Sequence, residues 1–396
     1  MTDAAVPRVL LLVCDSWGVG DAPDAEAYGD TGSDTLGNTA RAVGGIDAPN
    51  LASLGLGHLT PIDGVPPRAD AGAAYGRATE RSAGKDTTTG HWEMMGIRLD
   101  RPFPLYPDGF PPEIMRPFED AIGRQALGNV PASGTEIIDR LGEEHVRTGR
   151  PIVYTSGDSV FQIACHKDVV QLPTLYEWCR SARRLLTGPH AVGRVIARPF
   201  AGQPGSFVRT PERRDFSLPP PGPTVLDRLQ AAGVPVFAVG KIRDIFSGQG
   251  ITEGRYSDSN DHGVDLTLDY LRRPGPALVF TNLVDFDSKY GHRNDPPGYA
   301  TAVESFDARL PELIQALDGG VLFITGDHGC DPTTDTSTDH TRERTPLLAA
   351  GLGGGPFEIG TRESFGDLGQ TIAALLAVDA QGLEGSSFLD RLGDSV

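Results

Sequence analysis

The sequence predicts an α/β protein with a mostly parallel sheet flanked by helices. Several short apolar runs, each bounded by glycine, proline or polar residues, have the pattern of buried parallel strands. Apolar residues at three- and four-residue spacing over 299–317 predict an amphipathic helix between two of these runs. With 396 residues, the chain is too long for one ordinary core, so we expect two domains or one large domain with an insertion.

The predicted strands, in chain order, are Val9–Cys14, Val234–Val239, Ala277–Leu283 and Val321–Thr325. The helix Tyr299–Leu317 joins the last two strands into a βαβ unit. Each strand ends just before a group of polar residues. In open α/β sheets ligands bind outside the carboxyl ends of the strands, so these polar groups are candidate functional residues.

The segment between about 101 and 221 has a different composition. Prolines concentrate at both of its edges, in Pro102–Pro112 and in Pro219–Pro223, and such edges are typical of a crossing between domains. We therefore expect a catalytic core formed by residues 1–100 and 222–396, with residues 101–221 inserted as a smaller α+β cap domain.

Composition excludes several classes of protein. A formal net charge of −18 disfavours a nucleic-acid partner, because phosphates would be repelled. No apolar run approaches the roughly 20 residues of a membrane-spanning helix, and the run Val9–Val13 lacks the length and basic flank of a signal peptide. The four cysteines show no CxxC spacing, which fits a reducing cytoplasm. No obligate protein partner is evident.

Five polar clusters, far apart in the sequence, share one chemical character. They are Cys14–Gly18, Gly84–Glu93, Asp285–His292, Gly326–Gly329 and Thr338–Thr341. Carboxylate oxygens and imidazole nitrogens are ligands for divalent cations such as Mn²⁺ or Zn²⁺. Two adjacent cations need about six or seven ligands; the candidates are Asp15, Asp287, His292, Asp327, His328 and His340, with the hydroxyl of Thr87 as a seventh. Such a pair supports in-line phosphoryl displacement.

Simpler roles compete with these interpretations. A strand-end Asp often caps a helix, and the hydroxyl of Thr87 would have the same use if a helix runs on through Met95. Thr88 and Thr89 compete with Thr87 as nucleophile, since any threonine needs a group that removes its proton. His91 fits a structural hydrogen bond better than a metal ligand.

Longer motifs resemble those of the phosphopentomutases, members of the alkaline phosphatase superfamily. The resemblance covers nearly the whole chain; it includes Asp15–Gly20 with Pro23–Ala25, Gly84–Gly96, Tyr154–Gln162, Gly193–Phe200 and Asp339–Glu343. The string Lys85–Glu93 is the most specific to this family, whereas the metal ligands alone would indicate only the superfamily. The resemblance implies an alkaline-phosphatase-like core.

The resemblance also implies roles for individual residues. Thr87, three residues before Gly90, would be phosphorylated. Two manganese ions would be held by two sets of three ligands, Asp287, His292 and His340 for one and Asp15, Asp327 and His328 for the other. Asp285 would not be a ligand.

Substrate contacts follow from the same comparison. Arginine's planar fork suits phosphate oxygens, and positions that line the family's substrate site correspond here to Ser156, Asp158, Arg194, Ile196, Arg209 and Lys241. For Arg198, Arg213 and Arg214, phosphate contact and a solvated basic face stay open. The implied reaction interconverts α-D-ribose 1-phosphate, or its 2-deoxy counterpart, and the 5-phosphate through a phosphothreonine and a 1,5-bisphosphate, with a sugar bisphosphate as activator.

Two other functions share parts of this pattern. Another phosphomutase or phosphatase of the superfamily, such as cofactor-independent phosphoglycerate mutase, would use the same metals and nucleophile. A phosphosugar-binding protein without activity would keep only the binding site. Three departures from the family pattern, Gly157, Cys330 and the loop Asp335–Ser337, remove none of the candidate ligands.

Overall fold

The computed structural model describes residues 7–351 and 357–393. The chain forms two compact units, one made of Met1–Arg101 with Pro220–Val396 and the other of Pro102–Pro219. Within the described ranges, no helix is both long enough and apolar enough to cross a membrane.

An eight-stranded sheet forms the centre of the first unit. Its order is β10 (Glu253–Arg255), β9 (Val236–Val239), β11 (Ala277–Leu283), β1 (Arg8–Cys14), β12 (Val321–Thr325), β13 (Thr345–Ala350), β2 (Ala74–Ala78) and β14 (Phe357–Arg362). The first five strands are parallel to one another, whereas β13 is antiparallel to both of its neighbours. The predicted α/β class with a mostly parallel sheet is therefore confirmed.

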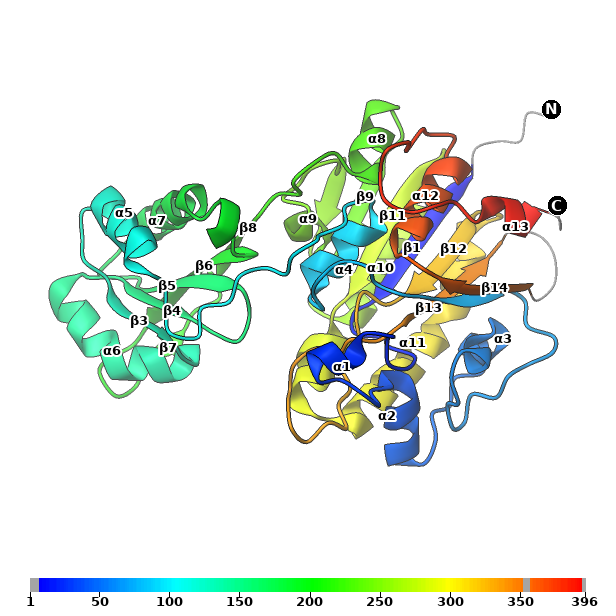
Figure 1. Ribbon diagram of the computed structural model, residues 1–396, viewed down its shortest axis with the longest axis horizontal. Helices are drawn as coiled ribbons and strands as arrows, with labels where there is room; N and C mark the ends of the chain where they lie inside the picture. Colours follow the sequence, from blue (N-terminus) through cyan, green and yellow to red (C-terminus); the bar gives the residue numbers. More distant parts are fainter. Residues whose placement is uncertain (1–6, 352–356, 394–396) are drawn as a thin grey trace. The chain divides into compact units, whose positions relative to one another are not determined.

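Helices cover both faces of this sheet (Figure 1). One face packs on α2 (Thr35–Val43), α3 (Pro49–Ser53), α10 (Asn260–Leu271) and α11 (Pro296–Leu317), which share a single apolar cluster with β1 and β12. The other layer contains α4 (Thr87–Met94), α8 (Val225–Ala231), α9 (Ile242–Ile245) and α12 (Gly366–Leu375). The short helices α1 (Ala25–Tyr28) and α13 (Leu389–Gly393) also belong to this unit.

Two predicted element boundaries are wrong by a few residues. The strand expected from Val234 begins at Val236, because the Val234 amide still donates to the carbonyl of Leu229 in α8 and Pro235 has no amide to donate. The helix expected from Tyr299 begins at Pro296, since the Asp295 side chain accepts the Gly298 amide and caps it there.

The second unit contains a smaller mixed sheet. Its strands are β3 (Leu127–Pro131), β4 (Ile152–Thr155), β5 (Val160–His166), β6 (Arg194–Ala201) and β7 (Val208–Arg209), with β8 (Arg214–Ser217) also paired to β6. The helices α5 (Pro112–Ile122) and α7 (Leu172–Leu185) pack in an apolar cluster on one face, while α6 (Gly134–Thr148) belongs to a separate cluster. This unit is thus an α+β fold with a core of its own.

Candidate metal centre

Strand register brings two of the candidate carboxylates to one edge of the large sheet. Val13 in β1 is paired with Asn282 in β11 and with Thr325 in β12. Asp15 and Asp327 lie two residues beyond their paired positions, so they leave neighbouring parallel strands at the same level. Both side chains are fully buried. An uncompensated pair of buried carboxylates is costly, which indicates that a cation belongs here.

In each of these two carboxylates, one oxygen accepts a hydrogen bond from the protein and the other accepts none. The Ser16 amide donates to Asp327 Oδ1 at 3.1 Å, and Asn282 Nδ2 donates to Asp15 Oδ2 at 3.1 Å. Over the ranges that the structure describes, Asp15 Oδ1, Asp327 Oδ2 and also Asp287 Oδ1 accept no hydrogen bond although they are buried. Buried oxygens without donors are unusual, and oriented carboxylates of this kind fit metal ligands.

The histidines present their Nε2 atoms to the same oxygens. His292 Nδ1 donates to the Thr338 carbonyl at 2.6 Å, and His328 Nδ1 donates to the Gly329 carbonyl at 3.0 Å. Each ring therefore has a lone pair on Nε2 when it is neutral. His328 Nε2 lies 3.4 Å from Asp15 Oδ1 and 3.3 Å from Asp327 Oδ2. This is the arrangement of a metal-ligating histidine whose other nitrogen is fixed by a carbonyl.

The second part of the cluster is built around Asp287, which follows β11. Its Oδ1 lies 3.4 Å from the Nε2 atoms of both His292 and His340. The rings of His328 and His340 stack with their centroids 3.8 Å apart, which joins the two parts. The structure thus brings all six predicted ligands together, with donor atoms grouped as Asp15, Asp327 and His328, and as Asp287, His328 and His340.

A third group of donor atoms includes Cys330, which was not among the predicted metal ligands. Cys330 Sγ, a carboxylate oxygen of Asp287 and a ring nitrogen of His292 all lie within 4.8 Å of one another. Its Sγ also donates weakly to the Asp339 carbonyl at 3.7 Å. Burial raises the pKa of this thiol well above its ordinary value, so the carboxylate and imidazole donors are the better ligands for a hard cation.

Electrostatics agree with a site that needs positive charge. Burial lowers the pKa of His328 to about 4, although the charge of Asp327 opposes the shift. Burial and the negative charge of Asp327 raise the pKa of Asp15 well above its ordinary value. A neutral imidazole beside two crowded carboxylates is the donor set that a divalent cation satisfies.

Thr87 is the first residue of α4 and faces this cluster. Its Oγ1 lies 3.2 Å from His328 Nε2. The competing role for this hydroxyl, helix capping, is filled by the Asp86 carboxylate, which accepts the amides of Thr88 and Thr89. The Thr89 hydroxyl, in turn, is buried and donates to Asp86 at 2.5 Å.

Two residues excluded from the ligand set have structural partners. His91 Nδ1 donates to the Thr87 carbonyl at 2.8 Å and lies 3.2 Å from Asp327 Oδ2. Asp285 accepts the Asn260 amide and Lys289 Nζ, each at 3.0 Å, and lies outside the donor groups described above.

Several contributors to the site were not identified from the sequence. Asn282 looks like an isolated polar residue in an apolar strand, yet it holds Asp15. Ser16 has a φ of 73°, and both its hydroxyl and its carbonyl contact the Tyr299 hydroxyl, at 3.0 and 3.1 Å. Lys241, by contrast, was predicted from the sequence, as a substrate contact. Its Nζ lies 3.7 Å from Asp15 Oδ2.

The second unit gathers basic side chains along β6. Arg194, Ile196 and Arg198 alternate along this strand and so lie on one face of the sheet. Arg194 forms ion pairs with Asp158 at 3.5 Å and with Asp215 at 3.7 Å. Burial, with the positive charge of Arg213 second, lowers the pKa of Arg198 to about 10. Crowded arginines of this kind fit an anionic ligand.

The Arg209 guanidinium lies close to the backbone of Gly134. A Cβ at Gly134, the first residue of α6, would lie 1.8 Å from Arg209 Nη2 and 2.5 Å from the Tyr154 hydroxyl. Within the described part of the chain, that buried hydroxyl has no hydrogen-bond partner. A guanidinium at a helix N-terminus is a setting that favours phosphate. Ser156, between β4 and β5, is half-buried.

Comparisons with known proteins give a consistent picture. The family model of the metalloenzyme superfamily matches residues 7–380. The phosphopentomutase of Kosmotoga olearia is 57% identical over 391 residues, covering 98% of this chain and 100% of the relative. That of Acetivibrio thermocellus is 55% identical, covering 97% and 99%, and that of Anaeromyxobacter sp. strain Fw109-5 is 58% identical, covering 98% and 99%.

Solved structures include two that match most of the chain. PH0037 from Pyrococcus horikoshii has a TM-score of 0.49 at 16% identity and covers 94% of this chain and 98% of that one. A phosphoglycerate mutase from Leishmania mexicana has a TM-score of 0.48 at 13% identity and covers 98% of both chains.

Proposed function

The chain belongs to the phosphopentomutase family of the metalloenzyme superfamily, and from this premise we propose that Thr87 receives and returns the phosphoryl group. The resemblance seen in the sequence is confirmed, and the protein is an isomerase of the phosphomutase type that uses divalent metal. The observation that carries the proposal is the 3.2 Å contact between Thr87 Oγ1 and His328 Nε2. This hydroxyl belongs to the first residue of α4, and a helix N-terminus favours phosphate.

The proposed cofactors are two Mn²⁺ ions, one held by Asp287, His292 and His340 and the other by Asp15, Asp327 and His328. The orphaned oxygens and the carbonyl-anchored histidines support this assignment. When bound, two such cations would neutralise charge on the transferred phosphoryl group and on the attacking and leaving oxygens.

The proposed substrates are α-D-ribose 1-phosphate, or its 2-deoxy counterpart, and the corresponding 5-phosphate. In the priming step, a P–O bond of a sugar bisphosphate breaks and a new P–O bond forms to Thr87 Oγ1, while the proton lost from the Thr87 hydroxyl ends on the released sugar oxygen. The phosphorylated Thr87 then donates to the free end of a pentose monophosphate, which gives the 1,5-bisphosphate. Returning the other phosphoryl group to Thr87 completes the isomerisation.

Substrate recognition is proposed for six residues. The proposed contacts are Ser156, Asp158, Arg194, Ile196, Arg209 and Lys241. The crowded arginines on β6 and the Arg209 side chain at the start of α6 support phosphate binding. Asp158 would accept hydrogen bonds from sugar hydroxyls, since a carboxylate is an acceptor only.

The proposed location is the cytoplasm, with no nucleic-acid or obligate protein partner. The four cysteines are buried and unpaired, which fits a reducing compartment. Residues 1–100 with 222–396 are the proposed catalytic core, and residues 101–221 the proposed cap.

Labelling separates the three threonines. Wild-type protein incubated with a ³²P-labelled sugar bisphosphate should carry phosphate on the peptide that contains Thr87. Thr87→Ala should lose the label while it retains its bound metal. Thr88→Ala is the matched control and should keep the label. Persistent label in Thr87→Ala, mapped to Thr88 or Thr89, would overturn the assignment.

Coupled assays with ribose 1-phosphate and with 3-phosphoglycerate then test the substrate. Turnover of the pentose phosphate is expected, and turnover of 3-phosphoglycerate alone would overturn the pentose assignment.

A further inference from the structure

Three carbonyls of the segment that leads from β2 to Thr87 accept hydrogen bonds from one side chain in a distant part of the sequence. The carbonyls of Glu80, Ser82 and Gly84 all accept hydrogen bonds from the guanidinium of Arg342, at 2.7, 3.0 and 2.6 Å. This segment has no regular secondary structure. Arg342 therefore satisfies backbone groups that a strand or a helix would otherwise satisfy.

Two carboxylates complete the surroundings of this guanidinium. Arg342 Nη1 donates to Glu80 Oε2 at 2.6 Å, and Nε and Nη2 donate to the two oxygens of Asp24 at 3.1 and 3.0 Å. The Arg342 side chain is only 2% exposed. All three nitrogens of the fork are thus engaged, in an arrangement that the three donors of a lysine do not reproduce.

The amides of the same segment are held from the opposite end of α4. Glu93, which is fully buried in that helix, accepts the Arg81 amide at 3.0 Å and the Ser82 amide at 2.5 Å. Its carboxylate also accepts the Ser364 hydroxyl at 2.9 Å. Arg342 and Glu93 together fix the carbonyls and the amides of the approach to Thr87.

Arg342 is also tied to the segment that carries a candidate metal ligand, because it lies two residues after His340. Its backbone amide donates to Asp30 Oδ2 at 2.8 Å. The same carboxylate accepts Lys85 Nζ at 3.0 Å, and Lys85 lies two residues before Thr87. The His340 segment and the Thr87 segment are therefore joined twice, by the guanidinium and through Asp30.

We propose that Arg342 is a positioning residue for phosphoryl transfer, which fixes Thr87 relative to the metal ligand His340 by acting as a template for residues 80–84. This inference rests on the proposed role of Thr87. Arg342 touches neither the substrate nor the reacting atoms. It acts on the rate because a misplacement of about 1 Å at a reacting group can cost roughly 100-fold in rate.

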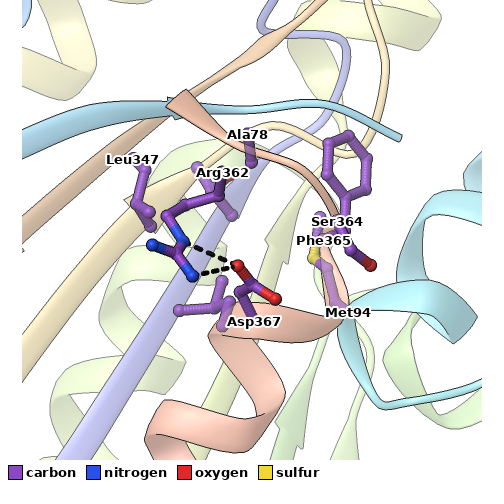
Figure 2. A pocket seen from close by; sticks show the side chains of 9 residues that line it. Ala78, Met94, Leu347, Arg362, Ser364, Phe365 and Asp367 are labelled. Carbon is purple, nitrogen blue, oxygen red and sulfur yellow. Dashed lines mark hydrogen bonds and ion pairs between the residues drawn. The ribbon is translucent and has the colours of Figure 1, made fainter. Parts of the chain in front are cut away.

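The test compares Arg342 with another arginine that has an ordinary structural role. Arg342→Lys keeps the charge and Arg342→Met keeps much of the apolar stem. The control is Arg362→Met, since Arg362 pairs with Asp367 at 2.6 Å (Figure 2) and its guanidinium also lies over the ring of Phe388. For each metal-loaded variant we would measure kcat, KM for ribose 1-phosphate, metal content, Tm and hydrogen exchange of the amides in residues 79–89.

Both Arg342 variants should lower kcat by about 100-fold, with KM changed less than about threefold on the same argument. Metal content should stay at the wild-type level, and amides in 79–89 should exchange faster. Arg362→Met should lower Tm while kcat stays within about twofold of wild type. If Arg342→Met does not fold, Arg342→Lys and Asp24→Asn carry the same test.

Two outcomes would overturn the proposal. One is an equal loss of kcat in Arg342→Lys and Arg362→Met, which would show a general effect of stability. The other is a loss of bound metal in the Arg342 variants. That loss would show that Arg342 supports metal binding by His340 and does not act by positioning Thr87. Hydrogen exchange reports on residues 79–89 whether or not Thr87 is the nucleophile. Absence of label on wild-type Thr87 would therefore overturn the proposed function separately.

Discussion

The Nε2 atoms of His292 and His340 lie 3.1 Å apart, and each lies 3.4 Å from Asp287 Oδ1. Two imidazole nitrogens at this distance share at most one proton between them. The Asp287 oxygen that faces both of them is buried and accepts no hydrogen bond among the described residues. A divalent cation would satisfy all three atoms at once, so the folded protein should be stabilised by metal.

Metal binding should therefore raise the melting temperature in a concentration-dependent way. A ligand that binds only the folded state adds about 2.7 kcal/mol at 100 times its Kd. We expect Tm of the EDTA-treated protein to rise when Mn²⁺ is added, and to rise less in His340→Ala. His58→Ala is the control, because His58 stacks on Tyr75 and bonds the Arg68 carbonyl. An identical rise in His340→Ala and wild type would contradict the site.

Asn282 should be needed for tight metal binding although it is not a ligand. Its amide fixes Asp15 Oδ2 and so leaves Oδ1 free for a cation. Loss of such an outer partner typically weakens metal binding 10- to 100-fold, so Asn282→Ala should raise the Kd for Mn²⁺ by about that factor. Thr281→Val is the matched control. The Thr281 hydroxyl, one residue earlier on β11, bonds the Thr267 hydroxyl at 2.7 Å instead. Equal Kd values in the two variants would contradict this role.

The parts of the site that sequence predicts are those whose signal is local. The strands β1, β11 and β12 are mostly apolar runs, and the Asp and His residues follow them directly. The strands β2 and β13 were not predicted, because Gly76 and Arg77 interrupt one and Pro346 the other. Their strand conformation depends on mutual pairing across more than 250 residues.

Positioning residues depend on partners that the sequence does not reveal. Asn282 and Asp15 are separated by 267 residues, and Arg342 and Glu80 by 262. Neither contact has a periodic or spaced pattern that sequence reasoning could detect. The choice among Thr87, Thr88 and Thr89 is similar, since only the fold shows that Thr89 bonds Asp86 while Thr87 faces His328.

Arg194 should act on substrate affinity rather than on metal binding. Its guanidinium is held between Asp158 and Asp215, which orients it on the face of β6. A hydrogen bond to a charged group contributes about 1.5–3 kcal/mol, so Arg194→Ala should raise KM for ribose 1-phosphate by about 10- to 100-fold. Metal content should not change. Arg180→Ala, which removes a surface ion pair with Glu177 and a contact with the ring of Phe216, should leave KM as in wild type. Unchanged kinetics in Arg194→Ala would remove this residue from the binding site.

Glu343 should make stability depend on pH. This buried carboxyl accepts the Thr35 amide at 2.9 Å and the hydroxyls of Thr35 and Thr341 at 2.6 Å. Burial nevertheless raises its pKa to about 8. Because the folded-state pKa exceeds the unfolded value, the contribution to stability is full at low pH and is lost as pH rises towards 8.

In Glu343→Gln the side chain is neutral at every pH, so the stability of the variant does not fall through ionisation at this position. The difference in Tm between wild type and Glu343→Gln, measured with saturating Mn²⁺, should therefore shift in favour of the variant between pH 6 and pH 9. Glu177→Gln is the control. Its exposed partner Arg180 lowers the pKa of Glu177, so its charge is constant over this range. A difference in Tm that stays constant for Glu343→Gln would show that Glu343 is already ionised at pH 6, and that its hydrogen bonds outweigh the cost of burial.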